Sequence, residues 1–123
     1  MKKNVLLVED ALDMIFLIHS ELQFLGYNCI VAEDGKKAVD MAVSYLPDLI
    51  LMDIVLPKMD GLKAVSLIRK NPKTQSIPVL AITAIALPGD KEKCLRAGCD
   101  DYIAKPFTYL ELSAAIKKLL NES

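Results

Sequence analysis

The sequence predicts an α/β fold: a doubly wound sheet of five parallel strands, in the order 2-1-3-4-5, with helices on both faces. Three observations favour it. Short apolar runs alternate five times with segments of helical periodicity, joined by short connections. The run Leu49–Met52 is continuously apolar, which is typical of a parallel strand covered on both faces. Several runs end abruptly in polar side chains, at the edge where open α/β sheets bind ligands.

Composition limits the possible classes of protein. A chain of 123 residues with 53% hydrophobic content predicts one domain over residues 1–123, with no output domain attached. The 15 basic and 16 acidic residues are interleaved, which disfavours direct binding to nucleic acid or to an anionic membrane. We expect no signal peptide, because the first apolar run is only four residues long, and no membrane span, because no apolar segment is long enough to cross a bilayer. An odd count of three cysteines favours a reduced, cytoplasmic setting.

The first strand is expected over residues 4–8, and it ends in Glu9 and Asp10. Residues 13–25 then show helical periodicity, and Gly26 is placed to cap this helix at its C-terminus. The residues at helical spacing are Met14, Ile18, Leu22 and Leu25.

A second strand over residues 29–32 leads into the next helix, which starts at Asp34-Gly35 and is stopped by Pro47. One face of that helix carries Ala38, Met41, Ala42 and Tyr45. The buried central strand follows and ends at Asp53, so this carboxylate is expected at the carboxyl end of a central strand.

Pro57 and Gly61 mark the loop after Asp53, and Asp60 is placed to cap a third helix that Asn71-Pro72 closes. Its inward residues are Leu62, Val65 and Ile68. The next strand, over residues 78–82, ends in Thr83-Ala84.

Residues 87–97 predict a weaker helix, with Pro88-Gly89 near its start and Gly98 at its end, and we expect it to be the least stable of the helices. The last strand, over residues 102–104, ends in Lys105-Pro106. Thr108 then caps a terminal helix, whose inward residues are Leu112, Ile116, Leu119 and Leu120.

Four strands thus end in chemically potent residues: Glu9-Asp10, Asp53, Thr83 and Lys105. In the predicted strand order the acidic residues face one another, and two unit charges about 4 Å apart repel by roughly 1 to 4 kcal/mol. One lysine cannot neutralise three carboxylates, so a hard divalent cation is expected, Mg²⁺ or alternatively Mn²⁺. Asp53 could then act as a nucleophile toward a phosphoryl group, with Thr83 and Lys105 each on one phosphoryl oxygen.

This arrangement closely resembles the receiver domain of two-component response regulators, of the single-domain, CheY-like type. The matching residues are Glu9-Asp10, Asp53, Thr83, Tyr102 and Lys105-Pro106-Phe107. The resemblance implies that Asp53 accepts a phosphoryl group from a histidine kinase or phosphotransfer protein. It also implies that Asp10, Asp53 and the Val55 carbonyl hold Mg²⁺, that Glu9 reaches the ion through water, and that the Lys105-Pro106 bond is cis.

The resemblance further implies a switch that assists its own phosphorylation and dephosphorylation and is not an enzyme in the usual sense. Thr83 would move toward the new phosphoryl oxygens, and the Tyr102 ring would enter the space behind it. Without the resemblance, Tyr102 reads as an ordinary packing residue. A downstream protein or a second copy would bind the fourth helix, fifth strand and fifth helix. Apolar Val55 and Ile85 cannot orient an attacking water, which predicts a long-lived phosphorylated state.

Two other functions use the same fold. A flavodoxin-like module that binds a phosphate or nucleotide should carry a Gly-rich or Ser/Thr-rich loop after its first strand, whereas Glu9-Asp10-Ala11-Leu12-Asp13 would repel phosphate. A scaffold that keeps the fold without phosphorylation should lack Asp53, Lys105 or an acidic partner, and all are present.

Overall fold

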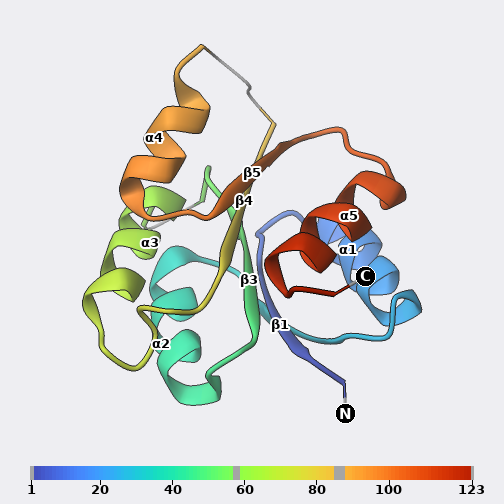
Figure 1. Ribbon diagram of the computed structural model, residues 1–123, viewed down its shortest axis with the longest axis horizontal. Coiled ribbons are helices and arrows are strands. Elements are labelled where there is room, and N and C mark those ends of the chain that lie inside the picture. The colour runs from blue at the N-terminus through green and yellow to red at the C-terminus, as the bar shows by residue number, and fades with distance from the viewer. Residues whose placement is uncertain (1, 57–58, 85–87, 123) are drawn as a thin grey trace.

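Five parallel strands form one sheet in the order β2-β1-β3-β4-β5, as predicted (Figure 1). The structure is a computed structural model that describes residues 2–56, 59–84 and 88–122. The elements along the chain are β1 (Asn4–Val8), α1 (Leu12–Phe24), β2 (Asn28–Ala32), α2 (Gly35–Tyr45), β3 (Leu49–Asp53), α3 (Gly61–Lys70), β4 (Val79–Thr83), α4 (Asp90–Ala97), β5 (Asp101–Ala104) and α5 (Tyr109–Leu119).

Helices cover the sheet on both sides, with α2, α3 and α4 against one face and α1 and α5 against the other (Figure 1). The central strands β3 and β4 are buried along their whole length. Because neighbouring residues of a strand point to opposite faces, Ile50 and Met52 pack on the first side and Leu49 and Leu51 on the second. Two apolar cores therefore hold the sheet rigidly from both sides, which fixes the ends of the strands.

The predicted caps hold most helices where the sequence places them. The side chains of Asp34, Asp60 and Thr108 each accept a hydrogen bond from the first turn of the helix that follows. Gly26 follows α1 with a φ of +93°, and the amides of Gly26 and Tyr27 bond back to the carbonyls of Gln23 and Leu22. This is the left-handed turn that glycine adopts at least cost, as expected for a C-terminal cap.

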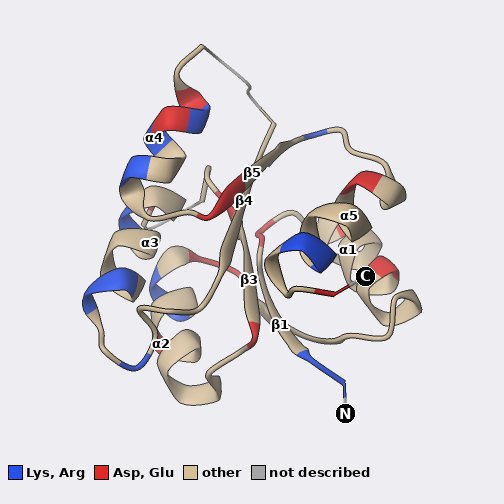
Figure 2. Cartoon of the chain, viewed as in Figure 1, with Lys and Arg blue, Asp and Glu red and all other residues tan. Residues whose placement is uncertain are grey.

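Two sequence expectations need correction. Tyr45 does not join the inward face of α2 but is 60% exposed, because the chain turns at Leu46 in a left-handed conformation and buries Pro47 instead. The fourth helix begins at Asp90, and Leu87, where we expected its start, lies outside the described residues. Figure 2 shows both acidic and basic positions along α4, and Cys94 is the buried residue of this helix.

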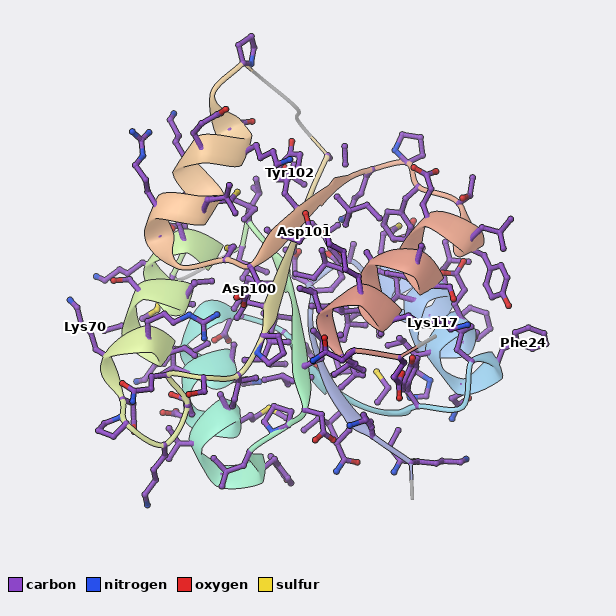
Figure 3. The ribbon with its side chains drawn as sticks, in the orientation of Figure 1. Phe24, Lys70, Asp100, Asp101, Tyr102 and Lys117 are labelled. Atoms are coloured by element: carbon purple, nitrogen blue, oxygen red, sulfur yellow. The ribbon has the colours of Figure 1, made fainter. Side chains whose placement is uncertain are left out.

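Several apolar side chains of α1 point away from the core. Ile18 and Leu22 are buried against the sheet, whereas Phe24 extends outward at the margin of the molecule (Figure 3). Among the described residues, no helix is both long enough and apolar enough to cross a lipid bilayer.

The first prediction concerns Gly61, where α3 begins against the end of β3. A Cβ atom at Gly61 would press against the carbonyl oxygen of Asp53 and would lie 2.8 Å from the Cα of Ile54, and both of these are backbone atoms that cannot rotate away. Gly61→Ala should therefore lower the free energy of unfolding by about 2 kcal/mol or more.

Gly26→Ala is the matched control, because a Cβ there meets nothing within 4 Å and adds only left-handed strain. That strain costs about 1 kcal/mol. Urea denaturation compares the two variants, and a Gly61 variant no less stable than the Gly26 variant would contradict the close approach.

Candidate functional site

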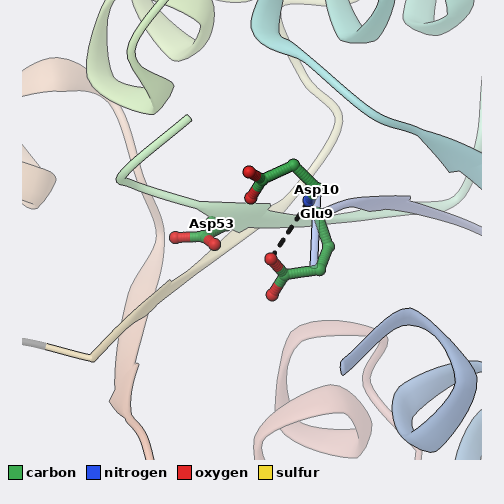
Figure 4. Close-up of side chains that lie close together, drawn as sticks. All are labelled: Glu9, Asp10 and Asp53. Carbon is green, nitrogen blue, oxygen red and sulfur yellow. Dashed lines mark hydrogen bonds between the residues drawn. The ribbon is translucent and has the colours of Figure 1, made fainter. Parts of the chain in front are cut away.

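Side chains from β1, β3, β4 and β5 meet at one edge of the sheet. The register aligns Val8 with Met52, and Thr83 with Ala104, so residues that follow these strands emerge side by side. Figure 4 shows Glu9, Asp10 and Asp53 together at this edge, and one carboxylate oxygen from each lies within 4.8 Å of the others. The convergence predicted from strand order is therefore present.

Lys105 brings the positive charge to this acidic group. Its Nζ donates to Glu9 Oε1 at 2.7 Å and lies 3.4 Å from Asp53 Oδ2. The Glu9 side chain is only 2% exposed, so this ion pair is shielded from water and screened little by salt. The lysine thus bridges two carboxylates and holds Glu9 more closely than Asp53.

Backbone amides donate to the second carboxylate oxygen of Asp53 and of Glu9. Asp53 Oδ1 accepts from the Val55 amide at 3.0 Å. Glu9 Oε2 accepts from the amides of Asp10 and Ala11 at 3.1 and 3.3 Å. These amides lie in the turns directly after β1 and β3, so the same local backbone that ends each strand also orients its carboxylate.

Burial and neighbouring groups shift the pKa values of Asp53 and Glu9 in opposite directions. Burial, followed by the hydrogen bond and negative charge of Glu9, raises the pKa of Asp53 to about 6, although the Val55 amide and Lys105 oppose the shift. Burial acts to raise the pKa of Glu9 as well, but its hydrogen bonds to Lys105 and Asp53 outweigh that effect and lower it. At neutral pH the site therefore holds more negative charge than Lys105 can balance.

The donor set fits Mg²⁺. Three carboxylates from two strand ends supply hard oxygen ligands, and Asp10 is exposed at the mouth of the site, which leaves room for water ligands. Burial and the neighbouring Glu9 carboxylate raise the pKa of Asp53, so a cation placed among these oxygens would favour its ionised form.

Thr83 and Tyr102 lie on the α4 side of the same sheet edge. Thr83 is buried as the last residue of β4, and Tyr102 is half-buried. Figure 3 shows Tyr102 on β5, on the side of α4. Both line a cavity of about 270 Å³ that lies under the first half of α4, and the other lining residues are Ile54, Val55, Leu62, Asp90, Lys93 and Cys94. A space therefore exists beside the Thr83 hydroxyl and the Tyr102 ring, the two groups that would move together in the expected switch.

The structure brings Glu9, Asp10, Asp53 and Lys105 together, with the Val55 backbone in contact with Asp53. The Lys105-Pro106 bond is cis, as the resemblance implied. Sequence reasoning missed that Lys105 binds Glu9 most closely. No sequence signal distinguishes which of three nearby acids a flexible lysine will contact.

Comparisons with known proteins agree with the fold and with the geometry of the site. The family model described as "Response regulator receiver domain" matches residues 5–117. The polar-differentiation response regulator DivK of Brucella anthropi is 37% identical over 123 residues, which cover the whole of both chains.

Solved structures agree closely in fold. The receiver domain of the sensor histidine kinase PA1611 from Pseudomonas aeruginosa, which has a magnesium ion coordinated in its active-site cleft, is 39% identical with a TM-score of 0.92, over 99% of this chain and 100% of that one. A response regulator from Chloroflexus aurantiacus is 30% identical with a TM-score of 0.94, over 99% and 100% of the two chains.

The second prediction follows from the pKa of Asp53. The folded value of about 6 lies above the reference value of 3.8, so the contribution of this carboxyl group to stability is fully present below pH 3.8 and is lost as the pH rises through about 6. Without metal, Asp53→Asn should therefore be more stable than the wild type at pH 8, by about 1 to 3 kcal/mol, with the difference shrinking toward pH 4.

Urea denaturation in a chelating buffer at several pH values measures this difference. Asp40→Asn, at an exposed position on α2, controls for the loss of one negative charge. A wild type more stable than Asp53→Asn at pH 8, or a difference that does not vary with pH, would show that folding does not raise the pKa of Asp53.

Proposed function

The chain belongs to the family of response regulator receiver domains, and we propose that Asp53 is the residue on which it accepts a phosphoryl group. Members of this family are phosphorylation-dependent signalling switches that act with histidine kinases or phosphotransfer proteins and with downstream partners. The observation that carries the assignment is the position of Asp53. It ends a fully buried central strand, it groups with the acidic residues after β1, and its Oδ2 lies 3.4 Å from the ammonium group of Lys105.

The proposed reaction is transfer of a phosphoryl group from a donor histidine to an Asp53 oxygen. The oxygen forms a bond to phosphorus as the bond between phosphorus and the donor nitrogen breaks. The Val55 amide holds Oδ1, which keeps the carboxylate in one orientation. Lys105, already 3.4 Å from Oδ2, takes one of the new phosphoryl oxygens, and the Thr83 hydroxyl donates to another.

Mg²⁺ would be held by Asp10, Asp53 and the Val55 carbonyl, with Glu9 reaching it through water, and it would neutralise charge on the phosphoryl oxygens. Glu9 has a second role in this proposal. Because its carboxylate pairs with Lys105 at 2.7 Å, it keeps the ammonium group inside the site and ionised before the phosphoryl group arrives. The domain would thus assist its own phosphorylation and dephosphorylation.

The proposed unit is the single domain of residues 1–123, working in the cytoplasm. The thiols of Cys29, Cys94 and Cys99 are unpaired, and burial raises the pKa of each, which suits unreactive thiols in a reducing compartment.

Output is proposed at α4, β5 and α5, where a downstream protein or a second copy of the chain would bind. The cavity between Thr83, Tyr102 and α4 offers space for the ring to move when Thr83 is drawn toward the phosphoryl group. Groups of both signs lie on this surface, where the exposed Lys118 lies 3.8 Å from the half-buried Asp101. Helix α4 has Gly89 as its N-cap residue and receives no side-chain cap there, which favours local rearrangement.

The third prediction tests the acceptor. Incubation with a small phosphodonor and Mg²⁺ should add one phosphoryl group to the intact protein, and Asp53→Asn should abolish the added mass because the amide is not a nucleophile. Intact mass spectrometry measures the product. Asp13→Asn, on the exposed first turn of α1, is the matched control and should be labelled normally. Labelling of the Asp53→Asn variant at the wild-type level would refute the assignment.

The fourth prediction concerns the lifetime of the phosphorylated state. Val55 is 63% exposed beside Asp53, and its apolar side chain cannot orient an attacking water. Val55→Asn should therefore change the rate of hydrolysis without loss of folding, as followed by loss of the phosphoryl mass with time. Ile85, the second expected control point, lies outside the described residues. Unchanged hydrolysis in both Val55→Asn and Ile85→Glu would remove this explanation of lifetime.

The fifth prediction concerns the switch. Thr83→Ala should still accept a phosphoryl group, more slowly, but should lose the changes in α4, β5 and α5 because no hydroxyl links phosphate to the Tyr102 cavity. Amide hydrogen exchange with and without a phosphoryl mimic would report these changes. Protection changes confined to α1 and α2 in the wild type would rule out the proposed output surface.

A further inference from the structure

A large cavity lies at the opposite end of β1 from the acidic site, and we call it the amino-end cavity. Its walls come from residues 2–3, which lead into β1, from residues 25–27, which join α1 to β2, and from the end of α5. The volume of about 760 Å³ lies within the range of pockets that hold small molecules. Because β1 is five residues long, roughly 16 Å separates this cavity from the acidic site.

Positive charge dominates the walls of the amino-end cavity. Its described lining contains three lysines and one carboxylate, which are Lys2, Lys3, Lys117 and Glu122. In the part of the chain that the structure describes, none of the three lysines takes part in an ion pair. Figure 2 shows basic positions in the segment that leads into β1 and late in α5. Ammonium groups around one cavity repel one another, so an anion placed among them would be stabilised.

Hydrogen bonds hold these walls in place before any ligand arrives. The Tyr27 hydroxyl donates to Glu122 Oε1 at 2.7 Å, which ties the end of α5 to the loop before β2. The Asn28 amide donates to the Lys3 carbonyl at 2.9 Å, which ties the start of β1 to the same loop. Burial, followed by the hydrogen bond and the charge of Glu122, raises the pKa of Tyr27 to about 12, so this hydroxyl remains a donor at neutral pH. A preformed cavity loses little conformational entropy when it binds a ligand.

One side of the cavity carries no charge. Leu25 and Gly26 line it there. Gly26 is exposed, and a Cβ atom at this position would meet nothing within 4 Å. Open space therefore lies over the loop, where a flat ring can rest against the backbone and the Leu25 side chain.

We propose that the amino-end cavity binds a nucleoside polyphosphate. The phosphates lie among the three lysines, because an ammonium group binds phosphate as a point charge. The base rests on the side formed by Leu25 and Gly26. Three ammonium groups opposed by one carboxylate require a ligand with at least two negative charges. Inorganic phosphate would meet that condition but would leave the uncharged side of the cavity empty.

A nucleic acid or a membrane fits the amino-end cavity less well. Each presents its charge over an extended surface, whereas the three lysines surround one cavity that also contains Glu122. The whole chain has a formal net charge of −1, which gives a long polyanion little to bind outside the cavity. The proposal goes beyond the phosphorylation switch, because this site lies at the other end of β1 and binding here needs no phosphoryl group on Asp53.

Isothermal titration calorimetry tests the proposal with ATP, AMP and adenosine as probes, in low-salt buffer without phosphate or divalent cations. ATP should bind about tenfold more tightly than AMP, and adenosine most weakly, because each added phosphate gains contacts with ammonium groups. Lys117→Ala should weaken ATP binding about tenfold for the same reason. Glu122→Gln should tighten it, because the amide keeps an oxygen for the Tyr27 hydroxyl but removes the negative charge.

Lys118→Ala is the matched control. This lysine neighbours Lys117 on α5 but lies outside the lining of the cavity, 3.8 Å from Asp101. Its loss should leave ATP binding unchanged, and both alanine variants should unfold in urea as the wild type does. Amide shifts in NMR spectra should map ATP to residues 2–3, 25–27 and 117–122.

Four results would overturn the proposal. These are absence of ATP binding, equal affinity for ATP and adenosine, equal weakening by Lys117→Ala and Lys118→Ala, and no gain in affinity in Glu122→Gln. Shifts centred on Asp53 and Lys105 would instead assign ATP to the acidic site. Tighter binding of anionic phospholipid vesicles or of a single-stranded oligonucleotide than of ATP would assign the lysines to a membrane or to a nucleic acid.

Discussion

The rest of the structure depends on the packing of the sheet between two apolar cores, because this packing holds Glu9, Asp10 and Asp53 together against their mutual repulsion. Parallel pairing of β1 with β3 brings these carboxylates to one sheet edge, where Lys105 bridges Glu9 and Asp53. The charge they carry can be held there only because two apolar cores fix the strands from both sides. The fold thus stores an unfavourable arrangement that a divalent cation would relieve.

The same edge connects this electrostatic site to the helix that would change. Asp53 and Thr83 end adjacent strands, and Thr83 shares a cavity with Tyr102 and the first half of α4. The far end of α4 is held firmly, because Arg69 donates to the Gly98 carbonyl at 2.9 Å and to Asp100 at 2.7 Å. Helix α4 is anchored at its C-terminus and lies over a cavity near its N-terminus, so it is well placed to respond to a small movement of Thr83.

Much of the fold could be predicted because local patterns and topology agree. Continuous apolar runs identified β3 and β4, and capping residues placed the starts of α2, α3 and α5. The alternation of strands and helices predicted a parallel sheet, and the doubly wound fold class supplied its strand order. The convergence of Glu9, Asp10, Asp53 and Lys105 then followed from the strand ends alone. Tyr45 was misplaced because the periodicity of a helix says nothing about where its last turn leaves the sheet.

Other features of the site depend on side-chain positions that sequence patterns do not encode. The preference of Lys105 for Glu9 and the split in pKa between Glu9 and Asp53 arise from distances and burial in the packed chain. A spacing rule identifies which residues meet, but only the packed structure shows which atoms pair and which are left without a partner.

The most direct test of the central claim is thermal unfolding of the wild type and Asp10→Asn, with Asp13→Asn as the control, in chelator and in increasing Mg²⁺. The account predicts a wild type that stays folded in chelator and whose Tm rises with Mg²⁺. Asp10→Asn should be at least as stable as the wild type in chelator, because one repulsive charge is gone, and should show a smaller rise. Unfolding of the wild type by chelator, or an equal rise in Asp10→Asn, would contradict it.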